Sequence, residues 1–378
     1  MTKRPEPLIA IDLVRFGCAA MVMLYHYFTT AWTEPSIAAK AFLVDVAPPP
    51  AAMLAAMRFN WIGVQLFFVI SGMVIAQSAA SSTGARFMQR RVLRLAPAAF
   101  VCATISAGMF AFTGTLVPDL FMRWLASVAL WPFAPQIDPV YWTIGVEMVF
   151  YFAVAALFST NRNGGTDRLA VILVMLSAGF WSVMLATGDL FRPLQEHALA
   201  LTLLPHGAFF ALGMLLTSAA RAGWTVRRLW LFASALCVGA TQIAVKANIR
   251  AEAVHLDAAP AVPLAIFLSG LALLAAAWAL QPQLARYIPP RTARVVGIAT
   301  YPLYLIHHEL GAAVIGALAA AGLGTVTAVG VTIAIMLALT WAIAAWLEPP
   351  VHSVMRSAAE RVSALPLMLR PTLTTRGR

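Results

Sequence analysis

The sequence predicts an all-α, polytopic membrane protein that crosses the bilayer about ten times, and three observations support this fold class. The chain of 378 residues is 61% hydrophobic and only 11% charged, and its mean hydropathy is +0.82. Soluble proteins are typically about 45–50% apolar and about 25% charged. Apolar stretches of the length that a bilayer crossing needs, roughly 20 residues, recur along the whole chain. This composition excludes a soluble enzyme built around one core.

The predicted spans follow one another with short connections and with no soluble domain between them. The ten spans cover residues 8–30, 60–80, 93–114, 139–158, 169–187, 198–218, 229–246, 260–280, 296–318 and 325–347. The first is not a cleavable signal peptide, because its apolar stretch is too long and contains Asp12 and Arg15. A further apolar segment, residues 120–133, is too short to cross comfortably, and we expect an interfacial or re-entrant helix there.

The basic residues predict the orientation of these spans. If the N-terminus is cytoplasmic, 19 of the 26 Lys and Arg residues fall in cytoplasmic segments, and Arg15 lies within the first span. The other six lie in outer segments: Lys40, Arg58, Arg123, Arg192, Lys246 and Arg250. This bias predicts cytoplasmic termini, with a transmembrane domain over 1–348 and a basic cytoplasmic tail over 349–378. The tail is either a helix on the membrane surface or a disordered segment.

Two features of the composition exclude other classes of protein. The net charge of +11 does not indicate a nucleic-acid partner, since the basic residues sit among apolar runs and not on one polar face. The three cysteines, Cys18, Cys102 and Cys237, form no C-x-x-C pair and lie in apolar stretches. We therefore expect three buried cysteines and neither a disulfide framework nor a zinc site.

Ionisable residues inside the spans are the best indication of function, because each costs roughly 2.5–3.5 kcal/mol on insertion scales. In the first span, a rotation of about 100° per residue places Arg15 and His26 on one face, about 16 Å apart along the helix. Asp12 lies within about 60° of Arg15 and can pair with it. These residues form either a polar stripe from the inner to the outer half, or an interfacial anchor pair with His26 snorkelling outward.

Glu147 is the ionisable residue of the fourth span, at a depth similar to that of His26. Thr143, Phe150 and Tyr151 share its face of the helix, so the carboxylate has polar neighbours. A lone glutamate at this depth would be strongly penalised, so we expect either a catalytic role or a structural pairing with Arg or His.

The ninth span carries two histidines and a glutamate, His307, His308 and Glu309, in its outer half. Tyr301, Tyr304 and His308 fall on one stripe, and His307 lies beside Tyr304 on its flank. One of the two histidines is expected to be only a packing or interfacial residue.

Four arginines crowd the inner end of the third span: Arg86, Arg90, Arg91 and Arg94. They are either a positive-inside cluster or an anion site, since guanidinium groups bind phosphate bidentately. Arg90 and Arg94 are spaced i and i+4 and share a face, with Arg91 beside them.

Five motifs together resemble the membrane acyltransferase-3 family, the integral-membrane O-acyltransferases of cell-surface glycans and related substrates. In chain order they read IDLVRFGCAAMVMLYHYF, GVQLFFVISGMVI, FMQRRVLRLAP, YWTIGVEMVFYF and GIATYPLYLIHH. They keep the order of the family and span residues 11–308, nearly the whole chain. Each motif is weak by itself, whereas the set is specific.

The resemblance implies roles for individual residues. The family's basic residue, followed by ten residues and a histidine, looks like Arg15 and His26. Its R-x-x-R looks like Arg91 and Arg94. These are the positions at which the family's catalytic and donor-binding residues are expected here.

The same resemblance implies two further positions, and a third position departs from the family's pattern. The glutamate of the family's Val-Glu stretch looks like Glu147, and the histidine of its Tyr-Leu-x-His pattern looks like His307. Gln65 stands where the family often has Asp, so we expect hydrogen bonding there and no acid or base role.

The resemblance implies an O-acyltransferase of the bacterial inner membrane, most simply an O-acetyltransferase. Its donor would be a cytoplasmic acyl-CoA such as acetyl-CoA, with the CoA phosphates on Arg91, Arg94 and Arg90. Its acceptor would be a hydroxyl of a carbohydrate or glycolipid at the outer leaflet, for example exopolysaccharide or lipopolysaccharide. His26 would be the general base, oriented by Glu147, and no metal is needed.

A transporter or proton-coupled exporter is the alternative class. Under that hypothesis His26, Glu147 and His307 would relay protons, and the arginine cluster would serve topology only. Transporters often contain paired broken helices in two halves, and the sequence has no convincing internal repeat. Thiol release from acetyl-CoA separates the two classes.

Overall fold

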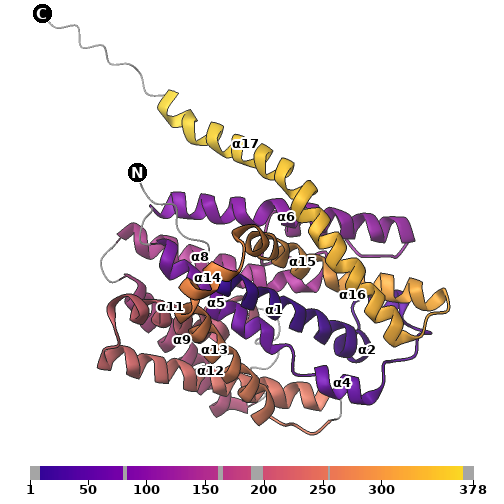
Figure 1. Cartoon of the computed structure of the whole chain (residues 1–378), viewed down its shortest axis with the longest axis horizontal. Helices are drawn as coiled ribbons and strands as arrows, with labels where there is room; N and C mark the ends of the chain where they lie inside the picture. Colours follow the sequence, from indigo (N-terminus) through magenta and orange to yellow (C-terminus); the bar gives the residue numbers. More distant parts are fainter. Residues whose placement is uncertain (1–8, 80–82, 161–164, 189–198, 254–255, 369–378) are drawn as a thin grey trace, which may run out of the picture.

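The computed structural model describes residues 9–79, 83–160, 165–188, 199–253 and 256–368, and the regular elements of these residues are all helical (Figure 1). Within these residues, ten helical segments are long and apolar enough to cross a membrane. Each overlaps one of the ten spans expected from the sequence, so the predicted fold class is confirmed. The chain is a multi-pass integral membrane protein.

The bundle has central helices and peripheral ones. The central helices are α1 (Ile9–Tyr25), α5 (Ile62–Ala79), α11 (Leu203–Ala222) and α15 (Pro290–Ala320). In the most apolar part of α11, 78% of the residues are buried, against 22% in α12 (Val226–Ala253), which therefore lies at the periphery. Cys18 and Cys102 are buried as expected, whereas the expectation of a buried Cys237 is wrong, because Cys237 lies on the peripheral α12 and is exposed.

Two glycines let α5 and α11 touch through their backbones. A Cβ atom on Gly213 would lie 1.9 Å from the carbonyl oxygen of Val69, and one on Gly72 would lie 2.1 Å from that of Phe210. No side chain fits such gaps, and small residues are what lets membrane helices approach closely. This contact fixes α5, which carries part of the candidate site.

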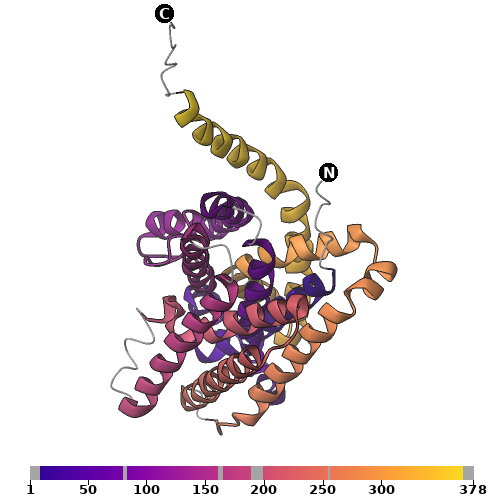
Figure 2. The ribbon, with the colours of Figure 1, turned by 90° about the vertical axis from the view of Figure 1, so that its left-hand side faces the viewer.

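The other spans surround this centre. They are α6 (Gly84–Thr113), α8 (Trp142–Thr160), α9 (Gly165–Thr187), α13 (Ala261–Ala279) and α16 (Thr325–Ala342), with the short α14 (Gln281–Tyr287) before α15. After α16, η5 (Ile343–Leu347) leads into α17 (Glu348–Met368), which extends away from the bundle (Figures 1 and 2). The tail is thus helical up to Met368, while residues 369–378 lie outside the described part.

Short helices occupy the connections. The predicted interfacial segment contains α7 (Leu120–Val128), which is too short to span a bilayer and exposes Phe121 and Met122. The loop after the first span contains α2 (Ala31–Thr33), α3 (Ile37–Phe42) and α4 (Ala51–Met57). Single turns of 3₁₀-helix, η2 (Pro139–Tyr141) and η4 (Leu199–Leu201), precede α8 and α11.

The orientation of the bundle stays a prediction, and two exposed residues test it. Lys40 on α3 is expected outside and Ser357 on α17 inside, and the side chains of both are exposed. In a Cys237→Ser background, Lys40→Cys should react with an impermeant thiol reagent in intact cells, whereas Ser357→Cys should react only after permeabilisation. Labelling of Ser357→Cys in intact cells would overturn the assignment of cytoplasmic termini.

Candidate active site

A cavity between α1, α5, α6, α8 and α15 contains several of the polar residues singled out in the sequence. It encloses about 760 Å³ of space, part of which is open to the surroundings. Its polar wall consists of Arg15, Ser71, Arg91, Arg94, Thr143, Glu147, Tyr151, Thr300, Tyr301 and Tyr304. Phe67 and Phe68 of α5 add an apolar wall. Three guanidinium groups and one carboxylate give this cavity a net positive charge, which suits an anionic ligand.

The arginines of α6 differ in their relation to this cavity. Arg91 and Arg94, almost one helical turn apart, both line it. Arg91 donates to Ser78 Oγ, its guanidinium lies 5.3 Å from the centroid of the Phe87 ring, and its Nε is buried without a partner among the described residues. Arg90 is exposed and is not part of the wall, because it is turned by about 100° from Arg91. The structure therefore brings two of the three arginines proposed for the donor together, and leaves Arg90 outside.

Arg15 joins these arginines from the first span. Its Nη1 lies 3.8 Å from Asp12 Oδ1, which confirms the pairing that the i, i+3 spacing predicts. The side chain of Arg15 is only 13% exposed, so this ion pair is held inside the bundle.

Glu147 faces the cavity and hydrogen-bonds there. Its Oε1 accepts from Ser71 Oγ at 2.7 Å and from Tyr151 OH at 2.5 Å. Among the described residues no hydrogen bond joins Glu147 to His26, so the expected carboxylate–histidine pair is not present. The carboxylate instead belongs to the part of the cavity that contains Arg91.

A cluster of histidines lies where α1 ends. His26 begins a π-helical turn, η1 (His26–Thr30), and such turns occur frequently at functional sites. Its Nδ1 lies 2.7 Å from His307 Nε2, and its ring centroid lies 4.3 Å from that of His308. The structure thus places both histidines of the ninth span beside His26.

The hydrogen bonds set the tautomers of these two rings. His307 Nδ1 lies 2.9 Å from the carbonyl oxygen of Leu303, which can only accept, so Nδ1 carries a proton. In a neutral His307, Nε2 then accepts from Nδ1–H of His26. The remaining nitrogen, His26 Nε2, is left with a free lone pair, as a general base requires.

His307 is itself fixed by a contact from η1. The hydroxyl of Tyr27 donates to the carbonyl oxygen of His307 at 2.7 Å. Gly311 makes room for this ring, since a Cβ atom there would lie 2.1 Å from the hydroxyl oxygen. The segment that carries His26 is therefore tied directly to α15.

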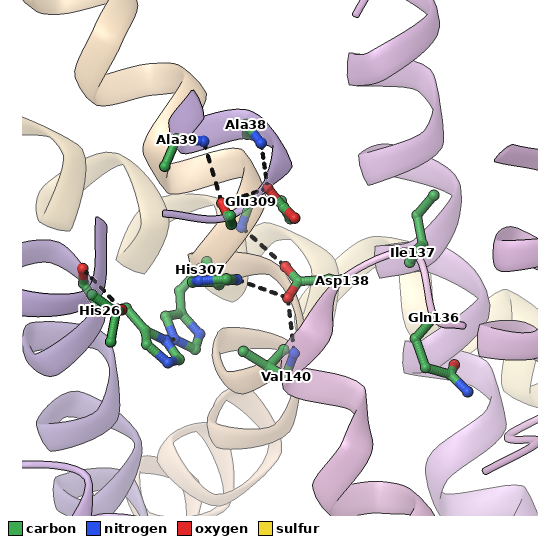
Figure 3. A network of polar contacts seen from close by, with 12 residues as sticks. His26, Ala38, Ala39, Gln136, Ile137, Asp138, Val140, His307 and Glu309 are labelled. Atoms are coloured by element: carbon green, nitrogen blue, oxygen red, sulfur yellow. Dashed lines mark hydrogen bonds and ion pairs between the residues drawn. The ribbon is translucent and has the colours of Figure 1, made fainter. Parts of the chain in front are cut away.

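Asp138 is the carboxylate next to this cluster, and it was not among the candidate residues expected from the sequence (Figure 3). Its Oδ1 accepts from Val140 N–H and from His308 Nδ1, and its Oδ2 accepts from Glu309 N–H, each at 3.0 Å. Burial alone raises the pKa of Asp138, but the charge and hydrogen bond of His308 and the two backbone N–H groups bring it below its usual range. The Asp-Pro pair before the fourth span is an N-cap signal that could have drawn attention to this residue.

Glu309 supports the same cluster from the other side. Its Oε2 accepts from Ser36 Oγ and from Ala38 N–H, both at 2.8 Å, and so fixes the start of α3 on α15 (Figure 3). Its second oxygen, Oε1, is buried without a partner among the described residues.

Tyr304 connects the cavity with the histidine cluster. Its ring lines the cavity, and its centroid lies 5.9 Å from that of His307. Its hydroxyl is hydrogen-bonded to Thr143 Oγ1 at 2.9 Å. Tyr304 therefore lies between the lining of the cavity and the ring of His307.

Replacement of Asp138 by asparagine tests whether the three hydrogen bonds of this carboxylate support the histidine cluster. An amide presents one oxygen and one NH₂ group to three donors, so at least one buried donor loses its partner, at about 1–3 kcal/mol. We expect a lower apparent melting temperature and a lower kcat in Asp138→Asn, and no change in Asp45→Asn, which alters an exposed aspartate. Unchanged melting and turnover in Asp138→Asn would show that the three hydrogen bonds do not support the cluster.

Comparison with known proteins adds an independent finding. A family model described as an acyltransferase domain, that of the acyltransferase-3 family, matches residues 8–347. Nodulation protein 10 of Rhizobium leguminosarum bv. viciae is 27% identical over 194 residues, which are 45% of this chain and 49% of that protein. Regulator of hypoxia-inducible factor 1 of Caenorhabditis elegans is 26% identical over 187 residues, 42% of this chain and 35% of that protein. The match thus spans about half the length of the first relative and about a third of the second. No solved structure matches this chain.

Proposed function

Because the chain belongs to the acyltransferase-3 family, whose model matches residues 8–347, we propose that it is a membrane O-acyltransferase, most simply an O-acetyltransferase. It transfers an acyl group from acyl-CoA to a hydroxyl of a carbohydrate or glycolipid. One observation carries the proposal: the ring of Tyr304, which lines a positively charged cavity, lies 5.9 Å from that of His307, in a histidine cluster where His26 Nε2 is left with a free lone pair.

The donor is assigned to the cavity. The phosphates of CoA bind at Arg91 and Arg94, with Arg15 close by, since guanidinium groups bind phosphate bidentately. The pantetheine arm extends along the apolar wall towards Tyr304. The distance of about 16 Å between Arg15 and His26, from the helical rise, is similar to the length of such an arm.

The chemistry is assigned to His26. Its Nε2 takes the proton of the acceptor hydroxyl as the oxygen attacks the thioester carbonyl. The carbon–sulfur bond then breaks, and the imidazolium of His26 returns the proton to the departing CoA thiolate. The products are an oxygen ester and free CoA. His307 holds the ring of His26, and Asp138 holds His308 beside it.

The setting is a cell membrane with the donor on the cytoplasmic side. The bias of basic residues supports cytoplasmic termini. The bacterial inner membrane is what the resemblance to the family implies. The acceptor then lies at the outer leaflet, where exopolysaccharide or lipopolysaccharide is available.

Release of free thiol tests the proposal. Purified protein in lipid nanodiscs, given acetyl-CoA and glycan extracted from the source cells, should release CoA thiol faster than without glycan. A transporter would leave the thioester intact, so an absence of thiol release from well-folded protein would contradict the proposed activity.

A further inference from the structure

A second pocket adjoins the segment that carries His26. It encloses about 380 Å³, partly open, and shares no lining residue with the first cavity. Its polar wall comes from the end of α1, from η1, from α12 and from the connections after α2, α4 and α12: Tyr25, Thr29, Arg250, Glu34, Arg58 and Asp257. The mechanism assigned to the first cavity uses none of these residues.

The wall of this pocket contains buried polar atoms that the protein does not satisfy. Thr29 Oγ1, Arg58 Nε and Arg250 Nε are buried and have no hydrogen-bond partner among the described residues. Buried polar atoms without partners are rare in folded proteins, and three around one pocket point to a polar ligand. Arg250 is held in place, because its guanidinium lies 5.2 Å from the ring centroids of both Tyr25 and Trp61.

The charges of the wall indicate what kind of ligand fits. Arg58 and Arg250 can only donate hydrogen bonds, whereas the carboxylates of Glu34 and Asp257 can only accept them. The two signs balance, so the pocket does not favour a purely anionic or purely cationic ligand. A hydroxyl group both donates and accepts, and a ligand with many hydroxyls therefore matches this mixed wall.

The pocket is next to the proposed base. Tyr25 precedes His26 in the chain, and the centroids of their rings are 5.7 Å apart. Thr29 lies in the same π-helical turn as His26. The wall of this pocket thus includes the residue before His26 and another residue of its π-helical turn.

We propose that this pocket is the acceptor subsite, in which Arg58, Arg250, Glu34 and Asp257 bind the non-reacting hydroxyls of a carbohydrate. The inference rests on the proposed function, because it presupposes a hydroxyl acceptor, and it adds the place and the residues that select it. Donor and acceptor then approach the histidine cluster through separate openings.

Arg58→Cys in a Cys237→Ser background provides the test, with the native glycan extract and acetyl-CoA as probes. The apparent KM for glycan should rise at least about tenfold, as expected for the loss of one charge-assisted hydrogen bond, while the KM for acetyl-CoA stays within about twofold. Modification with 2-aminoethyl methanethiosulfonate restores a positive charge and should recover much of the glycan KM. The negatively charged 2-sulfonatoethyl reagent should not recover it.

Two further variants serve as comparisons. Lys40→Cys changes an exposed residue outside the pocket. Its KM values for glycan and acetyl-CoA should equal those of the Cys237→Ser background, before and after reaction with either reagent. Asp257→Asn should also raise the KM for glycan and needs no reagent to reach the pocket. An unchanged KM for glycan in folded Arg58→Cys and Asp257→Asn proteins, or a rise in the KM for acetyl-CoA instead, would overturn the acceptor subsite. A background protein that transfers nothing would contradict the proposed function itself, so the two failures are distinguishable.

Discussion

His26→Ala should lower kcat for acyl transfer by about 10²–10⁴-fold, the usual contribution of a general base. The reason is the free lone pair on His26 Nε2. The affinity for acetyl-CoA should not change, because His26 does not line the cavity that contains the arginines. Turnover and acetyl-CoA binding are measured on the same purified protein.

A second substitution separates chemistry from structure. In His26→Gln a polar amide takes the place of the imidazole, but an amide is not a base. His26→Gln should therefore melt close to the wild type and be as inactive as His26→Ala. His352→Ala, on α17 away from the cluster, should retain wild-type turnover. Near-normal transfer by folded His26→Gln would remove His26 from the mechanism.

Arg91→Gln and Arg94→Gln should each weaken acetyl-CoA binding by about tenfold to a hundredfold, since each removes a charge-assisted contact of about 1.5–3 kcal/mol. Lysine should rescue only in part, because a point charge does not bind phosphate as a planar guanidinium does. Arg90→Gln is the matched control on the same helix and should bind normally, since Arg90 is exposed and outside the cavity.

The substrate can be truncated as well as the protein. Acetyl-pantetheine lacks the nucleotide phosphates of acetyl-CoA, so it should bind the wild type weakly and be insensitive to both arginine substitutions. If the arginines serve only topology, lysine would be fully equivalent and glutamine would disturb insertion without changing affinity. Unchanged acetyl-CoA affinity in well-folded glutamine variants would contradict the phosphate site.

Features that depend on local periodicity could be predicted from the sequence. The ten spans follow from apolar length, and the Asp12–Arg15 pair follows from its spacing of three residues. Tyr151 was expected on the face of Glu147 by the same rule, and its hydroxyl donates to that carboxylate. In both of these side-chain pairs the two residues lie on one helix, so the helical repeat determines which residues are neighbours.

Contacts between distant segments could not be predicted in this way. Asp138 lies in a connection and reaches His308, which is 170 residues away in the chain. Glu147 was expected at His26, but the packing of α5 against α8 gives it Ser71 as a partner. Likewise, the i, i+4 spacing predicts that Arg90 and Arg94 act together, whereas Arg91 and Arg94 are the residues that line the cavity. Such choices depend on how the helices pack, which periodicity does not determine.

The most direct test of the central claim is to follow the acyl group itself. Purified wild-type protein in nanodiscs is incubated with [¹⁴C]acetyl-CoA and source-cell glycan, and the label on the glycan is compared with the CoA thiol released. We expect one alkali-labile acetyl ester on the glycan for each thiol, and no labelled ester with His26→Gln. Thiol release without label on the glycan, or label that persists in His26→Gln, would contradict the account.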